Sequence, residues 1–427
     1  MQSAPGTGLY RKEEHDACGV GFVAQLGEPP SHRVIEQALE CLGCLTHRGA
    51  VDADGASGDG AGIAVQLPSA FFAREAQRLN ARFHFEWKVA VGVFFASRDQ
   101  SQRARAMSIA EEVLRRRSLF FVGWRPVPLE SQALGRQARE TQPSIWHLLV
   151  ALRASRNQRL NGAENFERHL YLARKEIECR LDDAGITDCY IPSFSSRNII
   201  YKGLLSPNQL GNFYQDLANP EFTASAALFH QRFSTNTSPS WYLAQPFRLV
   251  AHNGEINTLL GNRNWMRARE SVLEHPYWGE HVKWLKPVIQ AGGSDSASFD
   301  NTLELLTRSG RTVQHALLMM IPEAWESSVE IPPDVKAFYH YHSCLMEPWD
   351  GPAAMAFLDG HLVGAALDRN GLRPARYTVT HDGLVVLGSE VASCPLNPSA
   401  SRKKGVWVPV RFSWWISSTR RSSRTSR

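Results

Sequence analysis

Some segments of the chain have the pattern of apolar residues that is typical of a buried strand, and others have that of an amphipathic helix. The sequence therefore predicts a protein of mixed α and β structure. Residues 18–24, Cys-Gly-Val-Gly-Phe-Val-Ala, form a short apolar run that favours a buried strand. Ser31 is a suitable helix N-cap, and the apolar residues after it recur at helical spacing. They are Val34, Ile35, Ala38, Leu39, Leu42 and Leu45. We therefore predict that a buried strand is followed by an amphipathic helix.

The same patterns predict further elements in the first half of the chain. Residues 54–62 form a glycine-rich loop, and residues 89–95 are predicted as a strand. Residues 103–117 and 165–181 have the spacing of helices. Residues 196–203 are strand-like and end in a turn.

The clearest β signal covers residues 353–391. Asp359-Gly360, Asn370-Gly371 and Asp382-Gly383 recur every 11 or 12 residues between apolar runs. Such pairs mark hairpins, because both central residues of a type I′ turn need positive φ. The sequence predicts an antiparallel meander here, and an α+β fold with helices outside packed antiparallel sheets.

Composition and charge divide the chain into a body and a tail. Hydrophobic residues make up 43% and charged residues 21% of the 427 residues, as in a soluble globular protein. Residues 393–427 hold eight Lys or Arg and no acid, so the net charge of +5 leaves −3 for residues 1–392. We expect a leader at 1–17, a domain at 18–391, and an aberrant Ser- and Arg-rich tail at 392–427 without regular structure.

Several protein classes are not expected from these features. No apolar stretch approaches the roughly 18 residues of a membrane helix, and the N-terminus lacks the apolar core of a secretory signal. Seven cysteines spread over the chain favour a reducing cytoplasm over a disulfide framework. The mildly acidic body does not indicate nucleic-acid binding.

Cys18, followed by Gly19, is a candidate nucleophile. Such a cysteine is also a common small residue of a buried core. If the bond between Ala17 and Cys18 is cut, however, one residue carries a thiol and a free α-amine with a pKa near ~7.7–8.0. That amine can act as the general base for its own thiol.

Three polar motifs could bind an amino-acid substrate. Arg232, in a run with Thr235, suits either a structural salt bridge or a bidentate bond to an α-carboxylate. Asn253-Gly254 is either a turn or an oxyanion hole made of a side-chain amide and a backbone N–H. Asp295 is either part of a helix N-cap or a partner for a substrate ammonium.

Other motifs carry weaker signals. Cys41 and Cys44 have CxxC spacing, but they lie on the predicted helix, and no second pair accompanies them to form a zinc site. Residues 58–62 lack the endings of nucleotide-binding loops.

Taken together and in order, nine segments resemble the class II glutamine amidotransferases, and in particular the N-terminal domain of glutamate synthase large subunits. The segments are EHDACGVGF at 14–22, LTHRGA at 45–50, GDGAGI at 58–63, FHQRFSTNT at 229–237, AHNGEINT at 251–258, GSDSA at 293–297, MIPEAW at 320–325, YHYHS at 339–343 and LDRNGLRPA at 367–375.

The resemblance implies a fold and a set of roles. The fold is a four-layer α-β-β-α sandwich of the N-terminal-nucleophile hydrolase type, and its cysteine is exposed by removal of a leader. Cys18 would attack the glutamine amide, and Asn253 and Gly254 would bind the oxyanion. The substrate-binding residues would be Arg232, Thr235, Asp295 and Arg48, of which Arg48 would brace the chain end of the nucleophile.

The resemblance also implies what lies outside the chain. Glutamate synthase subunits continue with a half that binds FMN and an iron–sulfur cluster and passes ammonia to 2-oxoglutarate, so no cofactor or metal is expected in this chain. Its expected partners are L-glutamine and the remaining synthase domains or a small subunit. An inactive truncated remnant and a different class II amidotransferase are the alternatives.

Overall fold

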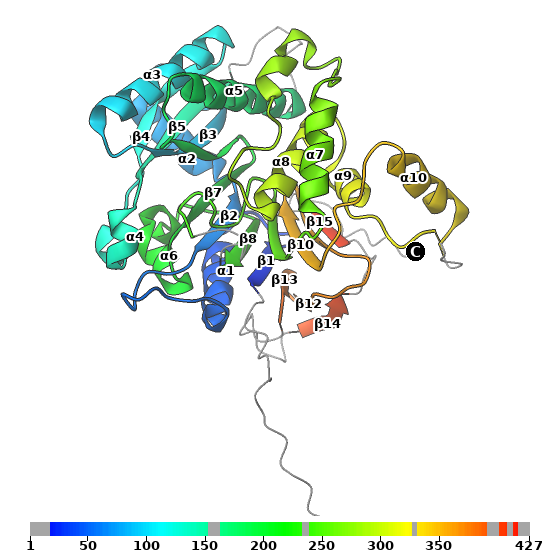
Figure 1. The fold of residues 1–427 in the computed structure, drawn as a ribbon. Helices are drawn as coiled ribbons and strands as arrows, with labels where there is room; N and C mark the ends of the chain where they lie inside the picture. The colour runs from blue at the N-terminus through cyan, green and yellow to red at the C-terminus, as the bar shows by residue number, and fades with distance from the viewer. Residues whose placement is uncertain are drawn as a thin grey trace, which may run out of the picture.

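The computed structural model describes residues 18–152, 163–232, 239–326, 331–390, 401–407 and 413–416. They form an α+β fold with three sheets in which all pairing is antiparallel (Figure 1). The predicted α+β class and the antiparallel sheets are confirmed. Among the residues described, no helix is long and apolar enough to cross a membrane.

The strands belong to one large and two smaller sheets. In spatial order, the seven-stranded sheet holds β14 (Ser401–Trp407), β12 (Ala375–Thr380), β13 (Leu384–Gly388), β1 (Gly19–Gln25), β8 (Ala226–Gln231), β2 (Ala61–Gln66) and β7 (Asn198–Gly203). The second sheet holds β15 (Ser413–Ile416), β11 (Leu362–Leu367), β10 (Ala353–Leu358) and β9 (Val250–Gly254). The third holds β4 (Phe120–Pro126), β5 (Ser144–Leu152), β3 (Lys88–Ala96) and β6 (Tyr190–Ser195).

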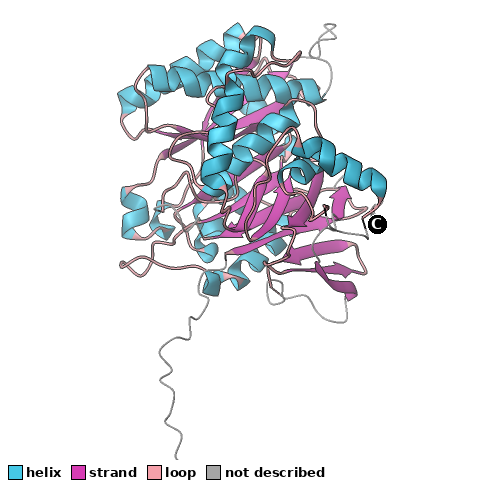
Figure 2. Ribbon diagram, turned by 45° about the vertical axis from the view of Figure 1, so that its right-hand side comes forward, coloured by secondary structure: helices cyan, strands magenta, loops and turns pink. Residues whose placement is uncertain are grey.

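The helices cover the outer faces of these sheets (Figure 2). They are α1 (Arg33–Cys44), α2 (Ser69–Leu79), α3 (Gln100–Arg116), α4 (Arg136–Glu140), α5 (Ala163–Asp183), α6 (Pro207–Phe213), α7 (Leu259–Glu270), α8 (Asp295–Arg308), α9 (Val313–Met320) and α10 (Pro333–Ser343). Short 3₁₀ helices occupy η1 (Thr46–Arg48), η2 (Ser131–Ala133), η3 (Gln215–Ala218) and η4 (Gly279–Leu285).

Four layers form the main body. In β1, Phe22 and Ala24 join an apolar cluster with residues of the second sheet, whereas Val23 packs with the apolar face of α1. This alternation is the period of a strand whose two faces are both buried. Helices α8 and α9 pack on the opposite face of the second sheet. The resulting order of helices, sheet, sheet and helices is the predicted α-β-β-α sandwich.

Most predicted elements of the first half are present, with shifted boundaries. Strand β1 and helix α1 follow each other as predicted, but the N-cap of α1 is His32, not Ser31. The backbone of Ser31 instead exchanges two hydrogen bonds with Ala224. Helix α3 begins three residues early because the Asp99 carboxylate accepts the Gln102 amide at 2.8 Å and caps it.

The predicted meander is only partly present. Hairpins join β10 to β11 and β12 to β13, and Gly360 and Gly383 have the positive φ that these turns require. Strands β11 and β12 do not pair, however, and they belong to different sheets. The prediction of a hairpin at Asn370-Gly371 was therefore wrong: the chain crosses from one sheet to the other there.

The expected tail contains two strands. Residues 401–407 pair with β12, and residues 413–416 pair with β11. The sequence predicted no regular structure in this stretch, and the two strands differ from that prediction. Each of these strands extends a sheet at one edge. The boundary of the domain at residue 391 stays a prediction.

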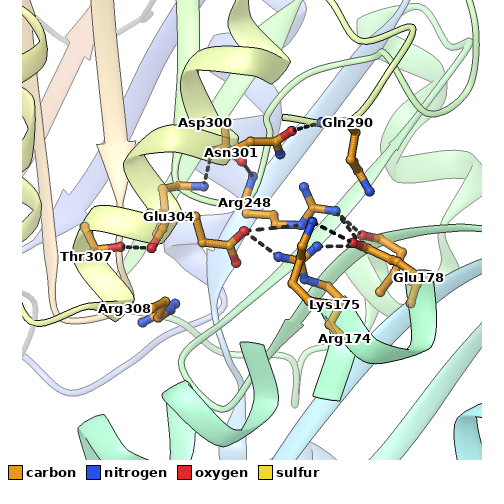
Figure 3. A network of polar contacts seen from close by, with 12 residues as sticks. Arg174, Lys175, Glu178, Arg248, Gln290, Asp300, Asn301, Glu304, Thr307 and Arg308 are labelled. Carbon is orange, nitrogen blue, oxygen red and sulfur yellow. Dashed lines mark hydrogen bonds and ion pairs between the residues drawn. The ribbon is translucent and has the colours of Figure 1, made fainter. Parts of the chain in front are cut away.

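Buried charges join α5, α8 and the segment before β9 (Figure 3). Arg174 on α5 forms ion pairs with Glu178 and with Glu304 of α8. Arg248 also pairs with Glu178, at 3.3 Å. Because a buried charge without a partner is costly, these pairs restrict how the two helices can lie against the start of β9.

Asp300 fixes the start of β9 (Figure 3). Its fully buried carboxylate accepts the amides of Arg248, Leu249 and Val250 at 3.1, 2.8 and 3.2 Å. Burial and the neighbouring Glu304 raise the pKa of Asp300 to about 6, so the group is ionised at neutral pH. One side chain of α8 thus satisfies three backbone donors.

We expect Asp300→Ala to lower the free energy of unfolding by about 3 kcal/mol, because three buried amides lose their acceptor. Urea unfolding monitored by circular dichroism measures this change. Glu86→Ala, at an exposed turn position, is the control and should alter stability by less than about 0.5 kcal/mol. An Asp300→Ala protein as stable as the control would contradict the assignment.

Candidate active site

Cys18 lies immediately before β1, the central strand of the large sheet. Strand β1 runs between β13 and β8, and Gly19 pairs with Gln231. This register places Cys18 next to Arg232, the residue that follows β8. The Cys18 side chain is 6% exposed. The thiol therefore sits at the junction of two strands, largely shielded from water.

Charged side chains from four segments surround this thiol. Burial raises the pKa of Cys18 to about 12, and Asp59 and Asp295 act in the same direction. Arg232 and Arg373 lower the pKa of the thiol. The predicted residues Cys18, Arg232 and Asp295 are thus brought together, and a separate base is needed to remove the thiol proton at neutral pH.

Arg232 has an unusual backbone conformation. Its φ is 85°, in the left-handed region that few non-glycine residues adopt. Its amide donates to the carbonyl of Gly60 at 2.7 Å, and its Nε lies 3.5 Å from Asp59 Oδ2. Such strained residues concentrate at functional sites. Burial raises the pKa of Asp59 to about 6, against the opposing effect of Arg232.

Asn253 and Gly254 end β9, on the second sheet. The residue before them, His252, is held by its backbone: its carbonyl accepts from His230 at 3.0 Å and from Gln245 at 3.3 Å. The Gln245 amide oxygen also accepts the His252 N–H at 2.8 Å. Asn253 is 1% exposed. The His230 contact joins β8 to β9 across the two sheets.

Gly254 is required where it stands. Its φ is 137°, and a Cβ atom there would lie 1.8 Å from the Pro352 carbonyl oxygen. The neighbouring strand β10 pairs Ala353 with Gly254. The positive φ lets the backbone turn directly after Asn253, a geometry that a residue with a side chain cannot adopt here.

Asp295 begins α8, and Ser294 is its N-cap. The Asp295 carboxylate is fully buried and accepts the amide of Ile256 at 3.0 Å and that of Ser296 at 2.7 Å. Its Oδ2 lies 3.8 Å from Nδ1 of His252.

Arg48 and Thr235 complete the set of predicted residues. Arg48, on η1, binds Glu390 at 2.9 Å, and His47 binds the other oxygen of Glu390 at 2.7 Å. Glu390 follows Ser389, whose amide donates to the Val20 carbonyl on β1. This places Arg48 near the start of β1, while its role toward a substrate stays a prediction. Thr235 lies outside the described residues.

Sequence reasoning missed Asp59 and Arg373. Asp59 is the one acid in the segment 58–63, and Arg373 lies in the segment 367–375; both segments were quoted for the resemblance, yet neither residue received a role. For Asp59, the available signal was an isolated charge among glycine and apolar residues. Within the described part of the chain, no group of three or more His, Cys, Asp or Glu is placed to hold a metal ion.

The model of the family "Glutamine amidotransferases class-II" matches residues 18–413. The chain belongs to this family. The match begins at the candidate nucleophile and includes every predicted site residue. The class-II amidotransferase assignment agrees with the four-layer sandwich and with the convergence of Cys18, Arg232 and Asp295.

Relatives of this amidotransferase chain are much longer proteins. It is 45% identical over 397 residues to the glutamate synthase [NADPH] large chain of Azospirillum brasilense, covering 92% of this chain and 26% of that one. It is also 45% identical over 400 residues to the ferredoxin-dependent glutamate synthase 2 of Synechocystis sp., covering 93% and 25%. The chain spans about a quarter of the length of these curated relatives.

We expect Gly254→Ala to destabilise this amidotransferase domain by about 3 kcal/mol, because the substitution forces a side chain into a left-handed backbone and against Pro352. Thermal unfolding measures the change. Gly261→Ala is the matched control: it lies within α7 with open space around it, and should stabilise by about 0.5–1 kcal/mol. Equal melting temperatures for the two variants would refute the account.

Proposed function

We propose that this chain hydrolyses L-glutamine to glutamate and ammonia, with Cys18 as an N-terminal nucleophile freed by removal of residues 1–17. The observation that carries the proposal is the meeting of Cys18, Arg232 and Asp295 in one buried site at the end of β1. A thiol whose pKa is about 12 is not nucleophilic at neutral pH without a base. The α-amine of a freed Cys18 is such a base, on the same residue.

Each step then has a named residue. The Arg232 guanidinium holds the α-carboxylate of glutamine, and Asp295 holds its α-ammonium. The Cys18 amine takes the thiol proton as the sulfur bonds to the side-chain amide carbon. The Asn253 amide and the Gly254 N–H stabilise the oxyanion. The Cys18 ammonium returns this proton to the amide nitrogen, which leaves as ammonia when the intermediate collapses to a thioester. Water then attacks the thioester and gives one proton to the sulfur through the amine, which releases glutamate and restores the thiol.

The names of the relatives suggest the fate of the ammonia. Because the relatives are glutamate synthases, we propose that this domain serves such an enzyme in glutamate biosynthesis, where 2-oxoglutarate is the acceptor in a synthase half. FMN, an iron–sulfur cluster and a small subunit would belong to that half. The 45% identity over nearly all of this chain supports the proposal.

We expect wild-type protein to begin at Cys18 and to release ammonia from glutamine, and Cys18→Ala to release none. Intact mass, N-terminal sequencing and an ammonia assay test this. Cys344→Ser, at an exposed cysteine, is the matched control and should keep wild-type activity. An active chain that still begins at Met1, or an active Cys18→Ala protein, would refute the mechanism.

We expect Asn253→Ala to lower kcat by about 10²–10³ while KM changes little, because the lost donor acts on the oxyanion. Steady-state ammonia release over a range of glutamine concentrations measures both constants. An Asn253→Ala enzyme whose KM rises while kcat stays unchanged would assign this side chain to ground-state binding instead.

A further inference from the structure

Arg373 is a charged neighbour of Cys18 on the segment that crosses from the second sheet to the large sheet, and the proposed mechanism gives it no role. It sits in the segment that leads from β11 to β12 and is half-buried. It affects the titration of both Cys18 and His252, so its charge lies near both residues. The other charged groups that face the thiol are Arg232 after β8, Asp59 before β2 and Asp295 on α8.

The register of the large sheet explains this position. Gly21 of β1 pairs with Gly388 of β13, and Gly388 pairs with Arg376 of β12. Three residues back along β1 lies Cys18, and three residues back from Arg376 lies Arg373. Cys18 immediately precedes β1 and Arg373 lies shortly before β12, so both lie at the same end of the large sheet, beside strands that are separated only by β13.

Asp368 fixes the segment that carries Arg373. This carboxylate is 2% exposed and accepts the amides of Ala353 and Asn370 at 2.9 Å and that of Leu372 at 3.2 Å. Ala353 in turn pairs with Gly254. The segment before Arg373 is therefore held to β10, the strand that pairs with the predicted oxyanion hole on β9.

The Arg373 guanidinium also differs from its neighbours in its partners. Arg232 lies beside Asp59, Arg48 binds Glu390, and Arg369 binds Asp350. Arg373 forms no hydrogen bond or ion pair with the residues that the structure describes, and its buried Nε has no acceptor among them. A partly buried guanidinium without a carboxylate partner favours an anion beside it.

We propose that Arg373 is a positioning residue for Cys18, whose guanidinium stabilises negative charge on the sulfur from the side opposite β8. This inference rests on the proposed role of Cys18 as the nucleophile. It adds a second cation to Arg232: Arg232 binds the substrate, and Arg373 favours the thiolate that attacks. The Arg373 guanidinium acts on the sulfur of Cys18 and forms no bond to glutamine.

The test is the rate at which iodoacetamide alkylates Cys18 between pH 6 and 10, followed by mass spectrometry of the peptide that contains Cys18. We expect Arg373→Met to react about 3- to 10-fold more slowly at pH 8, because loss of the nearby charge moves thiolate formation to higher pH. Arg373→Lys keeps the charge and should react within about twofold of wild type.

Two controls accompany this test. Arg369→Met removes an arginine of the same segment whose charge is paired with Asp350, and should alkylate at the wild-type rate. Cys41, fully buried on α1, should stay unreactive in every folded variant. If Cys41 of Arg373→Met reacts, the variant is unfolded and Arg373→Gln takes its place in the same comparison.

The inference is overturned if Arg373→Met or its Gln replacement alkylates with the wild-type pH profile. It is also overturned if the profile is unchanged and KM for glutamine rises, which would assign Arg373 to the substrate carboxylate. Alkylation of Cys18 needs no turnover, so the test separates this inference from the proposed function. If the wild-type chain releases no ammonia but Arg373→Met is alkylated more slowly than wild type, the proposed function is refuted and the effect of Arg373 on Cys18 is supported.

Discussion

Two carboxylates of one helix hold strand β9 at its two ends. Asp300 accepts the amides of residues 248–250 where the strand begins, and Asp295 accepts the amide of Ile256 just after it ends. The two acids are five residues apart on α8, about 7.5 Å along the helix axis. Because both are buried, neither hydrogen-bond set can be exchanged for water without loss. The position of Asn253 and Gly254 between these two anchors therefore depends on α8.

The charges near Cys18 are balanced in a way that suits the proposed substrate. Arg232 and Arg373 oppose Asp59 and Asp295 around a thiol that is otherwise shielded from water. Glutamine brings one carboxylate and one ammonium, so its binding changes the number of charges in the site but leaves their sum the same. In a medium of low dielectric constant a net charge would be costly, whereas a matched zwitterion is accommodated by local pairing.

Much of the fold and of the candidate site could be predicted from the sequence, because short segments of the chain indicate them. The apolar period of 18–45 predicted β1 and α1, and the quoted motifs predicted Cys18, Arg232 and Asp295, which the fold brings together. The N-cap of α1 could not be predicted, because the backbone of Ser31 is committed to Ala224, almost two hundred residues away. The left-handed backbone of Arg232, whose Nε lies 3.5 Å from Asp59, is likewise indicated by no pattern in the sequence.

The wrong prediction of a hairpin at Asn370-Gly371 and the failure to identify Arg373 have the same cause. The pair Asn370-Gly371 does turn the chain, since the φ of Gly371 is 60°, but a turn signal does not specify which strands it joins. Here the Asp368 carboxylate binds Ala353 of the second sheet, and the chain then enters the large sheet at β12. A segment that changes sheets in a sandwich has to pass the ends of both. At this end lie Cys18 of one sheet and Gly254 of the other, and the charge of Arg373, a residue on that segment, acts on the thiol.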